Sequence, residues 1–291
     1  MTRFFVVCVV LGFGISTAAQ DVAPVGRLLV RRYVEGETFA YLMKGKNNAN
    51  SYDVTITATV KKNADGRFVD ELAWSNGIVN GVPRQLSPAA QAIRVAVTLE
   101  GGVPFVLPNF TGARGLVGPV TDSLTFYSDL FVAMHGGTLN KAGDHLRVPI
   151  PMAPSWAGGP VIIGEDSFEF DITLTTVDTA HGTARLLVKH VPPAAPKIRI
   201  PAEWMREPVA DTPNNWVQVE KTATGFDASI GKETFDVDLT VNLADGKILS
   251  ATMDNPVTAV TRSCKDEALT QCGPSRPDPT FRHIEMTLLR K

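Results

Sequence analysis

Apolar and polar residues alternate through much of the chain. From Tyr52 to Lys61 the even positions are apolar and the odd positions are polar. Because successive side chains of a strand point to opposite faces, this period of two predicts a half-buried strand. The turn-forming segment 63–66 follows and ends in glycine, and the chain returns through 68–74. The two segments therefore form a predicted β-hairpin.

A second hairpin is predicted towards the C-terminus. Apolar residues at odd positions from Phe235 to Leu243 alternate with polar ones, 244–246 supplies an Ala-Asp-Gly turn, and 247–253 returns. The same alternation predicts further strands at 93–99, 168–174, 184–188 and 284–289.

One principal helix is predicted over 119–135. Pro119 suits the first turn of a helix, and Gly136 with Gly137 can end it. The apolar residues between them recur at helical spacing: Leu124, Tyr127, Leu130, Phe131 and Met134. A shorter helix is predicted at 87–91.

These elements predict a mostly β fold. Tight hairpins make neighbouring strands antiparallel, and each strand leaves one face polar. We expect one large curved antiparallel sheet, as an open barrel or a sandwich, with the 119–135 helix packed on its apolar face. A single domain over 20–291 is expected, and the proline-rich segment 192–201 is the candidate point of subdivision.

The first 19 residues have the three parts of a secretory signal peptide. Arg3 supplies a positive charge, a run of about 12 apolar residues follows, and Thr17 with Ala19 offers small residues before Gln20. The apolar run is shorter than the roughly 20 residues that span a bilayer, and no later segment approaches that length. We therefore predict a protein that is periplasmic or extracellular after cleavage, with no transmembrane segment in the mature chain.

The net charge of the chain limits the classes of binding partner that we expect. The chain has 28 basic and 30 acidic residues, a formal net charge of −2, and the basic residues are scattered. Nucleic-acid binding usually needs a basic excess. Nucleic acid and anionic membrane surfaces are therefore excluded as expected partners, which leaves an apolar small molecule or an envelope protein.

Two cysteines remain after the predicted cleavage, Cys264 and Cys272. In an oxidising compartment such a pair predicts a disulfide that closes a short polar loop. A metal or redox pair is the alternative, but redox pairs usually have closer C-x-x-C spacing and no histidine lies between these two.

No catalytic motif emerges from the chain. It has no G-x-S-x-G elbow, H-E-x-x-H helix or Walker loop, so no catalytic residue and no cofactor is predicted. The weak candidates for metal ligation or acid–base chemistry are Asp144, His145, Glu165 and Asp166. Neighbours in an extended segment point to opposite faces, so Asp144 and His145 are not expected to pair.

Aromatic residues offer the other candidate site. We expect an apolar ligand, if one binds, to contact residues of the helix and of the chain around it: Trp74, Phe126, Tyr127, Phe131 and Trp156. The alternative is that these rings are ordinary core.

Several segments resemble an uncharacterised family of secreted bacterial β-rich proteins. The segments are 124–130 (LTFYSDL), 142–145 (AGDH), 154–159 (PSWAGG), 164–167 (GEDS), 210–216 (ADTPNNW) and 246–256 (GKILSATMDNP). This resemblance implies export but no known activity. More loosely, an exported antiparallel sheet wrapped around a helix is similar to the periplasmic lipoprotein-carrier architecture, a likeness of shape that cannot decide function.

The leading hypothesis is an exported binding protein for an apolar ligand held on the concave side of the sheet. One alternative is a hydrolase, metal-assisted, built on Asp144, His145, Glu165 or Asp166. The other is a structural or protein-interaction component of the cell envelope that uses exposed strand edges or apolar patches.

Overall fold

The computed structural model describes residues 27–48, 50–101, 106–151, 161–163, 167–191, 202–210, 214 and 216–290. The predicted signal peptide and three candidate site residues, Trp156, Glu165 and Asp166, lie outside this part of the chain. Strands make up 52% and helices 14% of the molecule, so the predicted mostly β class is confirmed.

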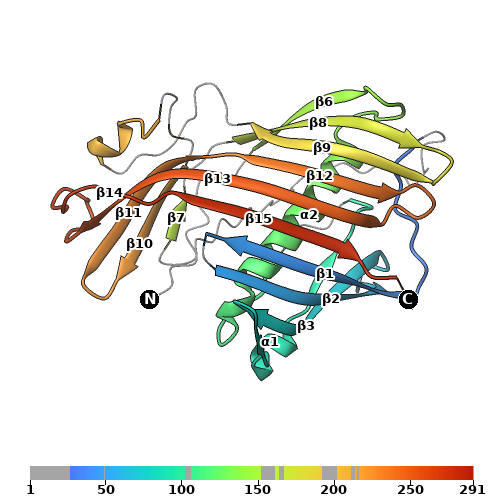
Figure 1. Ribbon diagram of the computed structural model, residues 1–291, viewed down its shortest axis with the longest axis horizontal. Helices are drawn as coiled ribbons and strands as arrows, with labels where there is room; N and C mark the ends of the chain where they lie inside the picture. Colours follow the sequence, from blue (N-terminus) through green and yellow to red (C-terminus); the bar gives the residue numbers. More distant parts are fainter. Residues whose placement is uncertain are drawn as a thin grey trace.

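The strands belong to one antiparallel sheet that does not close (Figure 1). They are β1 (Thr38–Asn47), β2 (Asn50–Lys62), β3 (Phe68–Val79), β4 (Val82–Arg84), β5 (Val95–Val97), β6 (His145–Pro151), β7 (Val161–Ile163), β8 (Ser167–Asp178), β9 (Thr183–Val191), β10 (Trp216–Thr222), β11 (Gly225–Glu233), β12 (Phe235–Asn242), β13 (Ile248–Cys264), β14 (Arg276–Pro277) and β15 (Thr280–Leu288). The helical segments are α1 (Pro88–Ala92), the 3-10 turns η1 (Arg114–Leu116) and η2 (Glu203–Arg206), and α2 (Val117–His135).

The main path of the sheet runs β4-β3-β2-β1-β15-β13-β12-β9-β8-β6. Strand β13 is the longest, with 17 residues, and it joins two parts of the sheet. Its first half pairs with β12 and β15, and its second half pairs with β11, which continues to β10 and β7. The sheet is thus continuous through β13.

Both predicted hairpins are present. Strands β2 and β3 meet at the turn that contains Gly66, which adopts a positive φ of 78°. Strands β12 and β13 meet at the turn that contains Gly246, where φ is 73° and a Cβ atom would collide with the Val30 carbonyl oxygen. Glycine is therefore required at position 246 for two reasons, backbone conformation and close approach.

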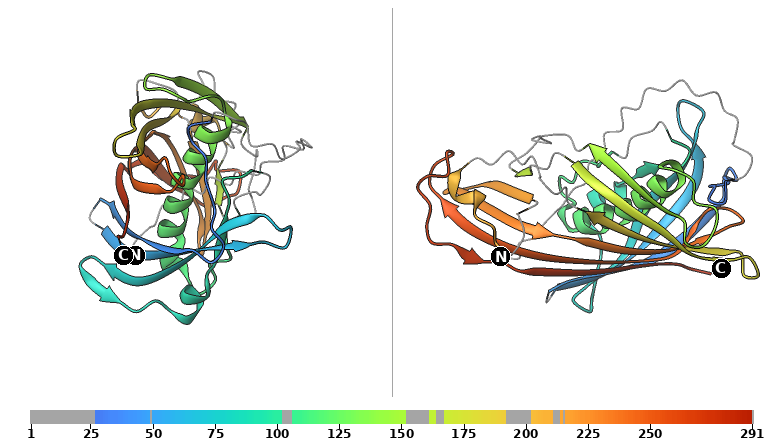
Figure 2. Two further views of the ribbon diagram at one scale, coloured as in Figure 1. Left: turned by 90° about the vertical axis from the view of Figure 1, so that its right-hand side faces the viewer. Right: turned by 90° about the horizontal axis from the view of Figure 1, so that it is seen from above.

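The predicted principal helix is α2, which lies on the concave side of the curved sheet (Figure 2). It is buried on nearly all sides, which explains why its apolar residues do not form a single narrow stripe. The shorter predicted helix is α1, which begins after Ser87, whose hydroxyl caps the Ala90 amide.

The buried apolar side chains of the described residues form two hydrophobic clusters. The larger lies between α2 and the main sheet, with Tyr41, Met43, Phe126 and Phe170 among its fully buried members. The smaller covers the β7-β10-β11 part of the sheet and is made by Met205, Val217, Val219, Ala228, Ile230, Cys264 and Leu269.

Two prolines lie within a strand at the edge of the sheet. Pro149 and Pro151 belong to β6, where Pro149 is paired in register with Glu169. Strand β6 ends the main path of the sheet and is bonded to β8. Proline is tolerated there because an edge strand has one side that donates no ladder hydrogen bonds.

Candidate functional site

The concave side of the sheet, where the apolar ligand was expected, is filled by α2 and its contacts. Phe126 is 0% and Tyr127 is 2% exposed, and both belong to the larger hydrophobic cluster. Phe131 is half-buried at the end of α2, where its ring stacks on His135 with centroids 4.3 Å apart. These three aromatic residues therefore pack within the fold or at its margin.

Helix α2 also brings charge into the interior. The Asp122 carboxylate pairs with the Arg282 guanidinium of β15 and accepts a hydrogen bond of 2.7 Å from the Tyr52 hydroxyl. Burial raises the pKa of Asp122, and the positive charge of Arg282 opposes that rise. Tyr52 reaches this position because its ring lies over Gly45 in the neighbouring strand, where any Cβ atom would collide with the ring.

The Arg282 guanidinium also donates to the Asn255 side-chain oxygen at 3.2 Å, and Asn255 in turn donates to the Thr234 carbonyl at 2.8 Å. Glu233 is buried close to this cluster, with 3% of its surface exposed. Burial raises the pKa of Glu233 to about 7, against the opposing charge of Arg282. One arginine thus faces two buried carboxyl groups.

A second buried pair lies one heptad further along α2. His190 Nε2 and an Asp129 carboxylate oxygen are 2.7 Å apart, and both side chains are almost fully buried. The imidazole lies between the rings of Phe170 and Phe235, at centroid distances of 4.5 and 4.9 Å. Burial raises the pKa of Asp129, and the histidine counteracts it. This pair anchors the helix to the sheet.

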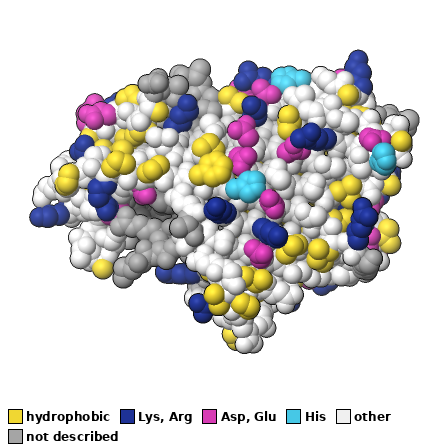
Figure 3. All heavy atoms as spheres, viewed as in Figure 1, with side chains coloured by type: hydrophobic (Ala, Val, Ile, Leu, Met, Phe, Trp, Pro, Cys, Tyr) yellow, Lys and Arg dark blue, Asp and Glu magenta, His cyan; other side chains and the backbone are white. Residues whose placement is uncertain are grey.

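The sheet's other face, turned away from α2, carries exposed charges in pairs. Figure 3 shows basic and acidic side chains mixed over this face. Cross-strand pairs include Arg185 with Asp238, and Lys189 with Asp236 at 3.5 Å. Such pairs contribute little to stability, because water and salt screen them. They leave little unbalanced charge on these strands.

A groove opens at the edge of β3. Strand β5 pairs with β3 at 70–72 and β4 pairs with it at 77–79. Among the described residues, no strand pairs with 73–76 on that side, because the chain leaves the sheet after β4, forms α1 and returns as β5. The resulting groove has a volume of about 720 Å³, within the usual range for small-molecule sites.

The shape of this edge has a local cause. The β2–β3 register shifts between Asp53 and Thr55, so β3 carries a bulge opposite that point. Asn76 sits in the bulge with a positive φ of 53°, a conformation that asparagine tolerates better than most residues. The bulge lies between the β4 and β5 pairings, which leaves the edge open there.

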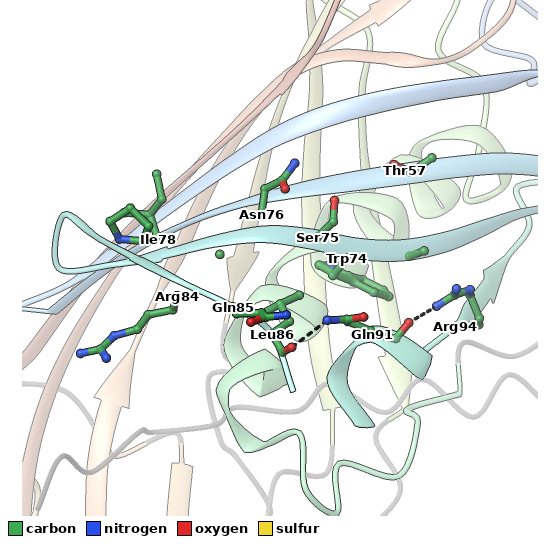
Figure 4. A pocket seen from close by; sticks show the side chains of 13 residues that line it. Thr57, Trp74, Ser75, Asn76, Ile78, Arg84, Gln85, Leu86, Gln91 and Arg94 are labelled. Atoms are coloured by element: carbon green, nitrogen blue, oxygen red, sulfur yellow. Dashed lines mark hydrogen bonds between the residues drawn. The ribbon is translucent and has the colours of Figure 1, made fainter. Parts of the chain in front are cut away.

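The groove combines apolar, neutral polar and cationic side chains. Its lining is Thr57, Ala73, Trp74, Ser75, Asn76, Gly77, Ile78, Pro83, Arg84, Gln85, Leu86, Gln91 and Arg94. Figure 4 shows Arg84 and Arg94 at opposite ends, with Trp74 between them. The Trp74 ring is buried, and its indole Nε1 has no hydrogen-bond partner among the residues that the structure describes. None of the described residues that line the groove is acidic.

Asp144 and His145, the two weak metal and acid–base candidates that the structure describes, have separate partners. The Asp144 carboxylate accepts hydrogen bonds from the backbone amides of Asn140 and Lys141, which lower its pKa. His145 Nε2 lies 2.6 Å from Asp171 across the β6–β8 pair. Within the described ranges, no three His, Cys, Asp or Glu side chains form a group that could hold a metal ion.

The predicted disulfide is confirmed. Cys264 at the end of β13 is bonded to Cys272, and the two also form an isolated antiparallel bridge. Within the loop, the Asp266 carboxylate accepts hydrogen bonds from the amides of Thr270 and Gln271. The loop is therefore held by both covalent and polar contacts.

Of the aromatic candidates predicted from the sequence, Trp74 lines the groove, and the other lining residues were not among the predicted candidates. Arg84, Gln85, Gln91 and Arg94 stand in a short segment with no recognised motif. The buried partners of α2 were also missed, since His190 and Arg282 lie 61 and 160 residues from Asp129 and Asp122. The available signal was the presence of two aspartates in a helix predicted to be buried.

In the part of the chain that the structure describes, no helix combines the length and apolar character needed to cross a bilayer. No protein-family model matches this chain, and no curated protein matches it either. The resemblance to a family of secreted bacterial proteins stays a prediction.

Proposed function

We propose that this chain is an exported binding protein that holds a small, partly apolar molecule in the groove beside β3. The observation that carries the proposal is the groove of about 720 Å³ at a stretch of β3 that no described strand covers. Ligand sites are typically concave and mainly apolar, with a few polar groups that fix orientation. Export is part of the proposal and depends on the signal-peptide pattern of residues 1–19.

The groove offers both kinds of contact. Ile78 and Leu86 supply apolar surface, and Gln85 with Gln91 supplies amide donors and acceptors. The exposed edge of β3 adds backbone groups that a ligand could bond in place of a strand. Of the four described aromatic candidates, Trp74 alone borders the groove.

The side chains of the groove and of the acid–base candidates favour binding over hydrolysis. The Asp144 carboxylate accepts a hydrogen bond from the backbone amide of Asn140, and the His145 ring contacts Asp171. Asp144 and His145 therefore do not support each other in acid–base chemistry. The groove itself holds no acid, histidine, cysteine or metal-binding cluster among its lining residues. Its lining suits recognition by shape, amide groups and cations.

The test is a fluorescence titration with 1-pyrenebutanol, an uncharged probe with a flat apolar ring. We expect saturable binding to the wild-type protein and at least about tenfold weaker binding to Gln85→Trp, whose indole would fill the middle of the groove. The matched control is Gln271→Trp in the Cys264–Cys272 loop, which should bind like the wild type. No saturable binding, or equal binding to Gln85→Trp, would contradict the proposal.

A further inference from the structure

We infer that the ligand of this groove carries a carboxylate and that Arg94 binds it; the inference rests on the proposed function. The groove lining contains Arg84 and Arg94 but no acidic residue, in a chain whose formal net charge is −2. Local positive charge without a neighbouring acid favours an anionic partner and disfavours a cationic one.

Arg94 is held in place by the end of α1. Its Nη1 donates to the Gln91 carbonyl at 2.6 Å and to the Ile93 carbonyl at 2.7 Å. Carbonyl groups near a helix C-terminus commonly accept such bonds. The guanidinium is therefore oriented before any ligand arrives, which lowers the entropic cost of binding.

The two carbonyls accept hydrogen bonds from Nη1 of Arg94, so Nε and Nη2 remain available to donate to a ligand. These two nitrogens form one edge of the planar guanidinium, and that edge matches the two oxygens of a carboxylate. The described residues provide no acidic partner for this edge or for Arg84. This differs from the face of the sheet, where Arg185 is paired with Asp238.

The positions of the groove residues then orient the ligand. Figure 4 shows Arg94 at one end, next to Gln91, and Leu86 and Ile78 further along. A carboxylate bound at Arg94 would place an attached apolar group against Leu86 and Trp74. The chemical class is thus an amphiphilic carboxylate, with the charged group at the Arg94 end.

The experiment compares 1-pyrenebutanoate with 1-pyrenebutanol, which differ in the carboxylate. We expect the wild-type protein to bind the acid at least about tenfold more tightly at low salt, since bidentate charged hydrogen bonds are among the strong ones. In Arg94→Gln the acid should bind no more tightly than the alcohol. Arg94→Lys keeps the charge but not the planar edge, so its preference for the acid should be intermediate. The matched control is Arg276→Gln on β14, which should keep the wild-type ratio.

The outcomes separate the two proposals. Binding of the alcohol without any preference for the acid would overturn the carboxylate inference and leave the binding function standing. An unchanged preference in both Arg94 variants would overturn the role of Arg94. Failure of both probes to bind the wild-type protein would overturn the binding function and this inference together.

Discussion

The interior beneath α2 and the groove beside β3 use arginine in opposite ways. Arg282 is buried, 8% exposed at its side chain, and it faces Asp122, Asn255 and the nearby Glu233. Arg94 lies at the surface and is bonded to two backbone carbonyls, and to no acidic residue in the described part of the chain. The first arrangement satisfies charges that the fold cannot expose to water, and the second leaves a charge available to another molecule.

The difference follows from the cost of burial. A buried ion pair stabilises little in comparison with apolar packing, but the loss of one partner leaves a charge with no compensation. Asp122 and Asp129 are seven residues apart on α2 and both face the sheet, where Arg282 and His190 meet them. These contacts hold α2 in the concavity, whereas the groove beside β3 lies at the sheet's edge.

The largest expected effect comes from breaking the interior pair. Arg282→Met would leave the Asp122 carboxylate buried without its cation, and we expect a loss of about 3–5 kcal/mol in the free energy of unfolding. Urea denaturation followed by circular dichroism measures this loss. The surface substitution Arg276→Gln should change the same quantity by less than about 0.5 kcal/mol. A loss below about 1 kcal/mol in Arg282→Met would show that the pair is not structural.

The second-largest expected effect is that Glu233 makes the free energy of unfolding depend on pH. Its pKa is about 7 in the folded protein against an ordinary value of 4.5. The folded state therefore holds this proton more tightly, and the group's contribution to stability falls as pH rises from 4.5 to 7 and is constant above that. The integrated loss is about 3 kcal/mol as an order of magnitude.

Glu233→Gln should remove this fall. Urea denaturation of the variant and the wild type at pH values from 4.5 to 8 gives the comparison, and we expect the variant to gain relative stability as pH rises from 4.5 to about 7 and to keep that gain at higher pH. Glu267→Gln, at an exposed position of the disulfide loop, is the control and should follow the wild-type profile. If the free energy of unfolding had the same pH dependence in Glu233→Gln and in the wild type, the assigned role of Glu233 in this pH dependence would be wrong.

The smallest expected effect is at the far end of the groove. Arg84 is exposed and separated from Arg94 in Figure 4, so water and salt screen its influence. Arg84→Gln should change the free energy of unfolding by less than about 0.5 kcal/mol and weaken 1-pyrenebutanoate binding only about two- to threefold. Urea denaturation measures the change in the free energy of unfolding. Calorimetric titration at two salt concentrations measures the change in 1-pyrenebutanoate binding. A loss as large as that of Arg94→Gln would place the carboxylate at the other end.

Local patterns were enough to predict much of the fold. The alternation in 52–61 and 235–243 became β2 and β12, because a period of two fits a sheet with one buried face. The helix predicted at 119–135 became α2, which begins two residues earlier at Val117. Ile93–Leu99 was predicted as a longer strand than β5, since only Val95–Val97 pairs with β3.

The candidate site was predictable to a much smaller extent. Trp74 was selected for its aromatic ring, but nothing in the local sequence indicated that the segment between β4 and β5 would leave the sheet edge open. Arg84 and Arg94 line the groove because the chain between β4 and β5 leaves the sheet and returns to it. Single arginines in polar segments give no pattern that sets them apart from solvated surface.

The sequence by itself determined the strands β2, β3, β5, β8, β9, β12, β13 and β15, the turns of the two hairpins, the principal helix and the Cys264–Cys272 pair, but not the strands β1, β10 and β11. These properties depend on short-range periodicity, turn chemistry and the two cysteines that remain after the predicted cleavage. The tertiary structure decided that α2 fills the concavity, that Asp122 and Asp129 find Arg282 and His190, and that a groove opens beside β3. Those outcomes depend on contacts between residues far apart in the chain, which no local pattern encodes.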